Sequence, residues 1–308
     1  MLNWCRGAFF QYIDLGESAM ILITGAGGKT GRSVLKALVL RGMPVRVLTH
    51  TPSQAQSLIG QGALEALSGD LQDGSIIRRA VKNIDKIYHI CPNVSPDEIV
   101  IGTSLIAAAK TAGVKHFVYH SVLHSQVEAM PHHWQKMRVE EVLFTSGLIF
   151  SILQPCAYMQ NILAGWNEIL GNGIYSVPYS VEARISIVDL RDVATAAAEV
   201  LESERYTNAI LECAGPQPLT QMEVARAISE VTGVSIIAKK QDPQQWESRV
   251  RQTGMNSYQV DTLLRMFDYY DKYGFVGNSR VLENVINKQP ITLKEFLTWY
   301  NQKPTDID

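Results

Sequence analysis

Short apolar runs alternate with stretches of helical periodicity through the first half of the chain. The apolar runs predict strands at Ile21–Thr24, Val45–Leu48, Leu64–Leu67, Lys86–Ile90, His116–Tyr119 and Phe150–Leu153. Between them, apolar residues recurring on one face predict helices at Arg32–Arg41, Ser53–Ile59, Asp73–Val81, Pro96–Thr111 and His133–Ser146. Strands that are apolar on both faces and alternate with helices indicate a buried parallel sheet. The pattern therefore predicts an α/β fold built on a doubly wound parallel sheet of six strands.

The pattern changes after Pro155, where the spacers between periodic segments become longer. Turns are expected at residues 171–173 and 214–218, and helices at Met222–Thr232 and Leu293–Tyr300. These shorter, less regular segments indicate a second, smaller lobe of mixed α/β structure.

We therefore divide the chain into three parts. Residues 20–155 form the sheet domain, and residues 156–308 form a smaller substrate lobe that is interleaved with the sheet. Residues 1–19 lack periodicity, and their apolar core is too short for a signal peptide. They are expected to be a poorly ordered extension, or to precede a true start at Met20.

Composition narrows the functional class. The chain has 308 residues, is 46% hydrophobic and carries a formal net charge of −2, so there is no basic excess to bind nucleic acid. The uncharged stretch at 142–167 is interrupted by polar residues and is not expected to span a membrane. The cysteines are far apart without a Cys-x-x-Cys pair, which favours a reducing, cytoplasmic location: Cys5, Cys91, Cys156 and Cys213.

A glycine cluster, "GAGGKTG", follows the first predicted strand. Gly25, Gly28 and Gly31 stand at three-residue intervals between that strand and a helix, with Thr30 beside the last of them. Such a turn lets the backbone approach a pyrophosphate, which then lies at the positive N-terminus of the helix. The motif predicts dinucleotide binding; the alternative is a tight turn with only a structural role.

The residues after the second predicted strand indicate which dinucleotide is bound. NAD-binding folds usually place an acidic residue there for the ribose 2′-hydroxyl, but no acid occurs from Met43 to Gly62. Lys29, Arg32 and His50 are available instead, and cations suit a 2′-phosphate. We therefore expect NADP(H) in preference to NAD(H), unless Lys29 and Arg32 are simply solvated charges at the helix start.

Several segments together resemble the NmrA-like branch of the atypical short-chain dehydrogenases. They occur in order from about Met20 to about residue 300: "ILITGAGGKTGRSVLKALVLRGMPVRVLTH", "SGDLQD", "AGVKHFVYHSV", "QKMRVEEVLFTSGL", "LQPCAYMQNIL", "SIVDLRDVATAAAEVL" and "ECAGPQPLTQMEVARAISEVTG". The resemblance implies a Rossmann domain with a small substrate lobe, NADP(H) as ligand, and Asp70 near the adenine. It also implies that Pro155, Tyr158 and Asn161 lie where the cofactor and substrate pockets meet; at Tyr158 the family more often carries Phe.

Candidate catalytic residues follow from the same resemblance. Short-chain dehydrogenases use Tyr-x-x-x-Lys on a helix and a serine from the preceding strand end. In "HHWQKM" Lys136 fits the lysine and Ser121 fits the serine, but His132 stands where the tyrosine should be. Lys136 followed by Met137 also resembles the isoflavone-reductase-like branch, in which the lysine itself is the acid. The alternatives for Lys136 are a solvated helix lysine or an inherited cofactor anchor.

Five of the seven histidines fall within eighteen residues, which raises the question of a metal site. His116 and His120 are on a predicted strand, and four strand steps of about 3.3 Å separate them too far for one ion. No metal site is therefore expected, although His120 and His132 could line the pocket. The sequence also lacks Gly-x-Ser-x-Gly and His-Glu-x-x-His motifs, which disfavours a hydrolase.

These observations predict an NADP(H)-dependent oxidoreductase that transfers hydride to a small organic acceptor such as a quinone, an aldehyde or an activated alkene. The alternative is a non-catalytic redox sensor that binds NADP(H) and acts through a protein partner, a role consistent with the missing tyrosine. A third interpretation is an assembly factor that retains a vestigial cofactor fold. The expected partners are thus a small-molecule substrate and either a regulatory protein or a second copy of the chain.

Overall fold

The computed structural model describes residues 19–302, and a seven-stranded parallel sheet forms its centre. The strand order is β10-β6-β5-β4-β1-β2-β3. Their bounds are β1 Ile21–Thr24, β2 Val45–Thr49, β3 Glu65–Ser68, β4 Lys86–His89, β5 His116–His120, β6 Phe150–Pro155 and β10 Ala209–Cys213. The expected doubly wound α/β fold is confirmed, and β10 adds a seventh strand to the six predicted ones.

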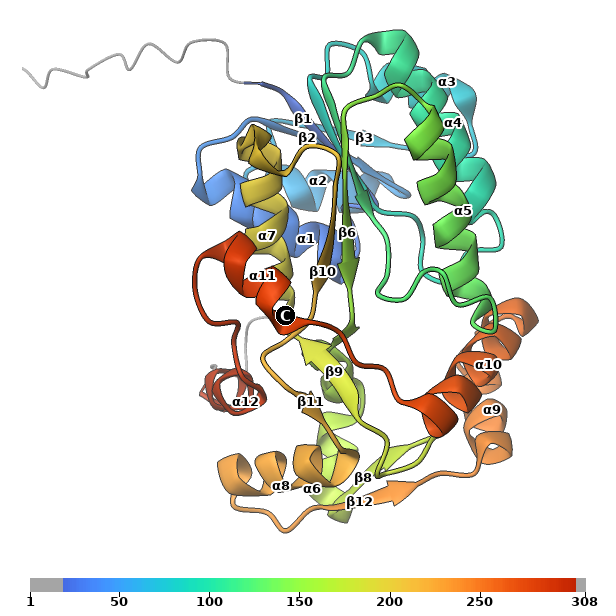
Figure 1. Ribbon diagram of the computed structural model, residues 1–308, viewed down its shortest axis with the longest axis vertical. Coiled ribbons are helices and arrows are strands. Elements are labelled where there is room, and N and C mark those ends of the chain that lie inside the picture. The colour runs from blue at the N-terminus through green and yellow to red at the C-terminus, as the bar shows by residue number, and fades with distance from the viewer. Residues whose placement is uncertain (1–18, 303–308) are drawn as a thin grey trace, which may run out of the picture.

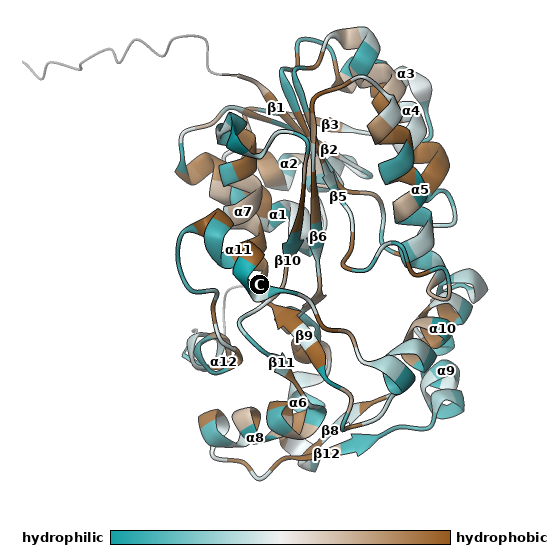
Figure 2. Ribbon diagram, viewed as in Figure 1, coloured by the Kyte–Doolittle hydropathy of each residue, from teal (hydrophilic) through white to brown (hydrophobic). Residues whose placement is uncertain are grey.

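Helices cover both faces of this sheet (Figure 1). The helices of one face are α1 Lys29–Leu40, α2 Pro52–Ile59 and α7 Leu190–Glu202, and those of the other are α3 Gly74–Ala80, α4 Glu98–Ala112 and α5 Pro131–Thr145. The strands are brown, and thus hydrophobic, over most of their length, while teal positions gather on the outer sides of the helices (Figure 2). Two apolar cores, one on each side of the sheet, therefore hold these layers together.

Local signals at the helix ends behave as the sequence suggests. Asp73 caps α3 by accepting a hydrogen bond from the backbone N–H of Ser75 at 2.8 Å. Gly113 ends α4 in the left-handed conformation, with φ of 75°. Strand β6 runs two residues beyond the predicted end, because Pro155 still pairs with Cys213 of β10 at the sheet edge.

The second lobe lies below the carboxyl ends of the strands in Figure 1. It contains one sheet of β7, β9 and β11 and another of β8 and β12. The strand bounds are β7 Ala157–Tyr158, β8 Ile174–Val177, β9 Ile185–Val188, β11 Pro218–Leu219 and β12 Ile237–Lys240. The helices are η1 Met159–Gly165, α6 Trp166–Asn172, α8 Gln221–Thr232, α9 Pro243–Gln252, α10 Ser257–Tyr273 and α12 Leu293–Asn301. The chain leaves the sheet after β6 and returns to it with α7, the short η2 Glu204–Tyr206, β10 and α11 Ser279–Ile286.

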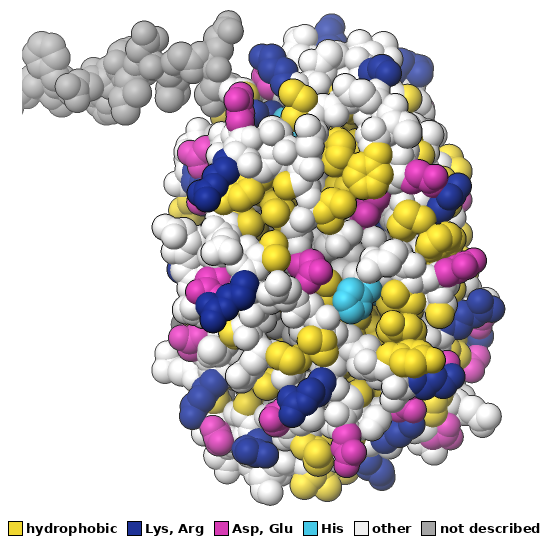
Figure 3. Space-filling view, in the orientation of Figure 1, with side chains coloured by type: hydrophobic (Ala, Val, Ile, Leu, Met, Phe, Trp, Pro, Cys, Tyr) yellow, Lys and Arg dark blue, Asp and Glu magenta, His cyan; other side chains and the backbone are white. Residues whose placement is uncertain are grey.

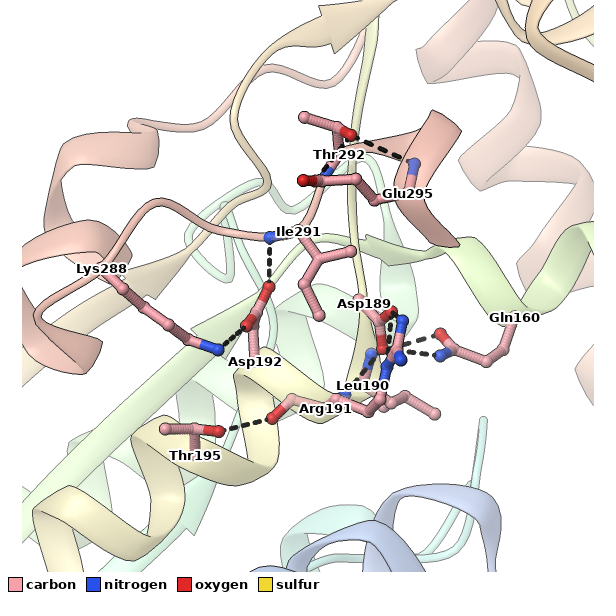
Figure 4. A network of polar contacts seen from close by, with 10 residues as sticks. All are labelled: Gln160, Asp189, Leu190, Arg191, Asp192, Thr195, Lys288, Ile291, Thr292 and Glu295. Carbon is pink, nitrogen blue, oxygen red and sulfur yellow. Dashed lines mark hydrogen bonds and ion pairs between the residues drawn. The ribbon is translucent and has the colours of Figure 1, made fainter. Parts of the chain in front are cut away.

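A polar network at the start of α7 joins the two parts (Figure 4). Asp189 is fully buried; it caps α7 through the N–H of Arg191 at 2.8 Å and accepts from Gln160 of η1 at 3.0 Å. Asp192, also fully buried, accepts from the backbone N–H of Ile291 at 2.6 Å and pairs with Lys288 at 3.2 Å. The two carboxylates thereby attach segments of the second lobe to a helix of the sheet domain.

Most of the predicted extension at residues 1–19 lies outside the described residues. Met20 is described, and its backbone N–H donates to Asp85 at 3.0 Å just before β1. Within residues 19–302, no helix combines the length and the apolar character that crossing a bilayer requires. Figure 3 shows lysine, arginine and acidic side chains interspersed over one face of the molecule, in keeping with the small net charge of −2.

Candidate functional site

The strand order defines a crevice at the carboxyl ends of β1 and β4. Strand β1 lies between β2 and β4, and the helices that follow β1 and β4 pack on opposite faces of the sheet. At such a switch point the connecting loops diverge and leave a ligand site above the strand ends. Thr24 of β1 and His89 of β4 meet at this point, with 2.7 Å between the Thr24 hydroxyl and the His89 Nδ1.

The glycine turn after β1 has the shape of an anion cradle. Gly25 has φ of 63°, and a Cβ there would lie 2.7 Å from the Ile90 carbonyl oxygen. A Cβ on Gly31 would lie 2.5 Å from Ala26 Cα, so helix α1 packs closely on the turn. Gly28, at the N-cap, is exposed, and a Cβ there would meet only the Gly25 oxygen at 3.6 Å.

The first turn of α1 leaves its backbone donors available. In the described part of the chain no side chain caps this helix, and its first turn contains no acidic residue. Uncapped N–H groups and the helix dipole together favour a bound phosphate. The residues present therefore fit the pyrophosphate of a dinucleotide, with Lys29 and Thr30 in the same turn.

Of the cations expected near a 2′-phosphate, Arg32 lies on the side of this turn that faces α2. The Arg32 guanidinium donates to the Gly27 carbonyl at 3.1 Å and to the Ser57 hydroxyl of α2 at 3.5 Å. Lys29 and His50 are both exposed, the former at the start of α1 and the latter directly after β2. Asp70, expected near the adenine, is exposed after β3 and accepts a hydrogen bond from the Gln72 N–H at 2.9 Å.

Lys136 is buried rather than solvated. Its Nζ donates to Glu98 Oε1 at 2.9 Å and to the His120 carbonyl at 3.2 Å, and it lies 5.3 Å from the Tyr119 ring centroid. The Tyr119 hydroxyl donates to the same oxygen of Glu98 at 2.7 Å. Glu98 is fully buried in the first turn of α4, and its Oε2 has no partner among the described residues. Sequence reasoning missed this carboxylate; the available signal was an acid starting an otherwise apolar helix.

Ser121 belongs to a separate buried network. Its hydroxyl donates to Glu140 Oε1, and the amide of Gln154 donates to the two Glu140 oxygens at 3.0 and 3.2 Å. Gln154 also donates to the Ser125 hydroxyl at 3.1 Å. The Ser121 hydroxyl is thus directed toward α5.

His132 lies in the first turn of α5, one turn before Lys136. Burial lowers its pKa well below the usual range, and its Nδ1 has no hydrogen-bond partner within residues 19–302. The ring is therefore neutral at pH 7. His133 is held differently: its Nδ1 donates to the Leu123 carbonyl at 2.9 Å, and burial lowers its pKa to about 4.

His120, the last residue of β5, lies between two tyrosines. Its Nδ1 is 2.7 Å from the Tyr88 hydroxyl, and its Nε2 is 2.7 Å from the Tyr158 hydroxyl. Tyr158 is the second residue of β7, the short strand that directly follows the buried Pro155 and Cys156. Asn161 is exposed in η1. The carboxyl ends of β5 and β6 thus bring His120 and Tyr158 together, a contact that the sequence did not predict.

The histidine cluster does not converge on a common point. His116 is hydrogen bonded through Nε2 to Ser151 at 2.9 Å, whereas His120 contacts the two tyrosines. Across the described residues, no group of three or more His, Cys, Asp or Glu side chains is arranged to hold a metal ion.

Comparison with known proteins places the chain in a family. A model of the NmrA-like family matches residues 17–307. The chain belongs to the NmrA-like family. An NAD(P)H azoreductase of Xenophilus azovorans is 32% identical over 216 residues, which cover 70% of this chain and 74% of the relative.

Two solved structures share the fold of this NmrA-like protein. The NADPH-dependent quinone oxidoreductase of Escherichia coli, complexed with NADPH, matches with a TM-score of 0.81 at 24% identity, over 92% of this chain and 100% of that one. NmrA, a negative transcriptional regulator complexed with NAD, matches with a TM-score of 0.74 at 16% identity, over 91% and 94% of the two chains.

Proposed function

We propose that this NmrA-like protein is an NADP(H)-dependent reductase that transfers hydride to a small organic acceptor, either a quinone, an aldehyde or an activated alkene. The observation that carries the proposal is the N-terminus of α1, which no side chain caps and which lies at the switch point between β1 and β4. The glycine turn that leads into this helix packs closely against Ile90. The activities named for the azoreductase and the quinone oxidoreductase support it.

Each part of the cofactor has a candidate partner. The pyrophosphate is assigned to Gly25, Gly28, Thr30 and Gly31. The 2′-phosphate is assigned to Lys29, Arg32 and His50, and the adenine to the surroundings of Asp70. Lys136 anchors the nicotinamide ribose, because Glu98 and the His120 carbonyl fix its ammonium at the carboxyl ends of β4 and β5. Pro155, Tyr158 and Asn161 border the acceptor side. The bound cofactor supplies the hydride.

Cofactor preference tests the first half of the proposal. NADPH should bind about 10- to 100-fold more tightly than NADH, since charge-assisted hydrogen bonds to a phosphate contribute about 1.5–3 kcal/mol. Isothermal titration of Lys29→Gln and His50→Gln should show weaker NADPH binding and unchanged NADH binding. Lys36→Gln, which changes another exposed lysine of α1, is the matched control. Equal dissociation constants for the two nucleotides in the unmodified protein would exclude the NADP(H) preference.

A sensor that binds NADP(H) without turnover is the second candidate. Two observations favour it: His132 replaces the expected catalytic tyrosine, and the NmrA regulator shares the fold. Purified protein should be mixed with NADPH and a panel of quinones, aldehydes and activated alkenes, while the nicotinamide absorbance is followed. Oxidation above the protein-free rate supports the reductase. Tight NADPH binding with no oxidation on any acceptor supports the sensor, and a regulatory partner should then be sought.

A further inference from the structure

The hydrogen bonds around His120 specify which of its nitrogens carries the proton. The Tyr88 hydroxyl is completely buried, and within residues 19–302 its one hydrogen-bond partner is His120 Nδ1. A buried hydroxyl left without an acceptor costs about 1–3 kcal/mol. Tyr88 therefore donates to Nδ1, and Nδ1 is the unprotonated nitrogen of the imidazole.

The proton of the neutral imidazole is consequently on Nε2. Burial lowers the pKa of His120 to about 3, so the ring carries a single N–H at pH 7. This Nε2–H lies 2.7 Å from the Tyr158 oxygen and donates to it. Tyr158 accepts from His120, and its own proton is left to point elsewhere.

The Tyr158 hydroxyl faces the cofactor turn. Burial raises the pKa of Tyr158, and the nearby Thr30 side chain acts in the opposite direction, so the hydroxyl lies near the first turn of α1. Tyr158 is half-buried, while His120 is only 5% exposed. The tyrosine is thus the outermost member of a chain that begins at the buried Tyr88 and ends at the predicted junction of cofactor and acceptor.

We propose that Tyr158 is the catalytic acid of this protein, donating its proton to the oxygen of a quinone or aldehyde acceptor, and that His120 is the positioning residue behind it. The inference rests on the proposed reductase function and narrows the acceptor to one with a carbonyl oxygen.

The proposed step transfers one hydride and one proton to the acceptor. The acceptor carbonyl takes hydride from the bound NADPH, which becomes NADP⁺, and its oxygen takes the Tyr158 proton. The phenolate that remains is stabilised by the N–H of His120, as a fixed donor stabilises developing negative charge. Once the product has left, the phenolate takes a proton from water that enters the vacated acceptor site. His132 and Lys136 need not give up a proton in this scheme.

Kinetics of matched variants test the assignment. Tyr158→Phe keeps the ring and should lower kcat about 100- to 10,000-fold, the usual contribution of general acid catalysis, with NADPH affinity unchanged. His120→Leu should lower kcat about 100-fold, as expected for losing one donor to a developing anion, with little change in KM. His120→Gln should recover most of this loss, because its amide can accept from Tyr88 and donate to Tyr158. Tyr273→Phe, at an exposed tyrosine, is the control.

A measurement without turnover tests the tautomer itself. In protein labelled with ¹⁵N-histidine, with the His120 signals assigned by their loss in His120→Gln, Nδ1 should have the shift of an unprotonated nitrogen and Nε2 that of a protonated one. In Tyr88→Phe this preference should weaken. A proton on Nδ1 in the unmodified protein would overturn the inference.

The two proposals fail in different ways. If the unmodified protein oxidises NADPH with a quinone or aldehyde and Tyr158→Phe does so equally fast, the Tyr158 assignment is wrong and the reductase function stands. If the unmodified protein binds NADPH but reduces no acceptor, both are wrong. If Tyr158→Phe loses turnover but also loses NADPH binding or thermal stability, the tyrosine is structural and the assignment is again wrong.

Discussion

Among the single residues of the candidate site, Lys136 shows how burial changes the interpretation of a motif. The sequence identifies it by its place in "HHWQKM", and the structure adds a carboxylate, Glu98, from a helix far away in the chain. Both side chains are buried, with exposed side-chain fractions of 7% and 0%. Removing one member of such a pair leaves an uncompensated charge in a medium that solvates it poorly.

A double-mutant cycle should reveal this coupling. Glu98→Gln or Lys136→Met alone should lower the free energy of unfolding by about 3–5 kcal/mol, because each leaves the other charge buried and unpaired. The double variant should be clearly more stable than the sum of the single effects predicts. The free energies come from urea unfolding in the absence of cofactor.

The exposed pair Lys272 and Asp268 on α10 is the matched control for this cycle. Its two side chains are about half or more exposed, so a double-mutant cycle on this pair should give a coupling energy of less than about 1 kcal/mol. Strict additivity of Glu98→Gln and Lys136→Met would contradict the idea that the buried ion pair holds Lys136 in place.

Sequence reasoning reached some of these residues and missed others for a physical reason. Gly25, Gly31 and Lys136 are marked by spacing within one element, which a linear pattern records. Glu98, and the contact of His120 with Tyr158, depend on which strands become neighbours in the sheet. The order β6-β5-β4-β1 brings these side chains together, and the local pattern of the chain does not contain that order.

At the scale of elements, two glycines of the turn between β1 and α1 have different roles: Gly31 allows the helix to pack, and Gly28 keeps the helix N-terminus accessible. Gly31 has no room for a side chain, because a Cβ would lie 2.5 Å from Ala26 Cα and 2.6 Å from the Gly25 oxygen. Gly28 has room within the protein and faces the space where the pyrophosphate is proposed to bind. One glycine allows the helix to pack, and the other keeps the approach to the helix open.

Alanine substitutions should separate these roles. Gly31→Ala should lower the free energy of unfolding by roughly the 1–3 kcal/mol that overpacking costs, and the melting temperature should fall with it. Gly28→Ala should leave the melting temperature nearly unchanged but weaken NADPH binding at least about tenfold, a loss of 1.4 kcal/mol or more. Thermal melts and NADPH titrations of both variants check this. Gly165→Ala, at a position with φ of −121° where a Cβ meets nothing within 4 Å, is the control. Unimpaired NADPH binding by Gly28→Ala would place the pyrophosphate elsewhere.

The predicted elements are the ones with strong periodicity or a glycine stop. The six central strands and their helices are confirmed, with ends shifted by a few residues. The seventh strand, β10, was missed although four of its five residues are apolar, because it follows the irregular second lobe and pairs with β6, a strand far away in the chain. Helix α10 was also missed, although Asn256 and Gln259 form a capping box and Gly274 ends the helix. That signal was local and could have been read.

At the scale of the whole molecule, buried polar groups link the layers. Asp189 and Asp192 tie η1 and the segment before α12 to the start of α7 (Figure 4), and His89, His116, His120 and His133 are buried in or beside the sheet. A histidine that is buried in the neutral form makes stability depend on pH. Below its ordinary pKa the unfolded chain gains a proton that the folded chain does not take up, and this favours unfolding.

The whole protein should therefore lose stability in mild acid. Burial lowers the pKa of His89 and His120 to about 3 and that of His116 and His133 to about 4. Their pKa in the unfolded chain is about 6.5, so between about pH 6.5 and pH 4 the unfolded chain binds more protons than the folded one. The free energy of unfolding therefore decreases as the pH is lowered through this range. At pH 5 these groups together remove several kcal/mol, a large share of the roughly 5–15 kcal/mol that stabilises a typical domain. Most carboxylates with a lowered pKa, such as Asp73 and Glu295, change the free energy of unfolding only at pH values below this range.

Urea unfolding between pH 7.5 and pH 5 measures this loss directly. Stability should be nearly constant above pH 7 and decline steeply below pH 6.5, with a slope of several protons per molecule, because His132, whose pKa burial also lowers, adds to these four groups. His116→Gln, which keeps a donor for Ser151, should reduce the slope by about one proton, or 1.36 kcal/mol per pH unit. His50→Gln, at an exposed histidine, should leave the slope unchanged. A stability that stays flat down to pH 5 would mean that the buried histidines accept protons in the folded protein, and the neutral His120 on which the Tyr158 assignment depends would then need a different explanation.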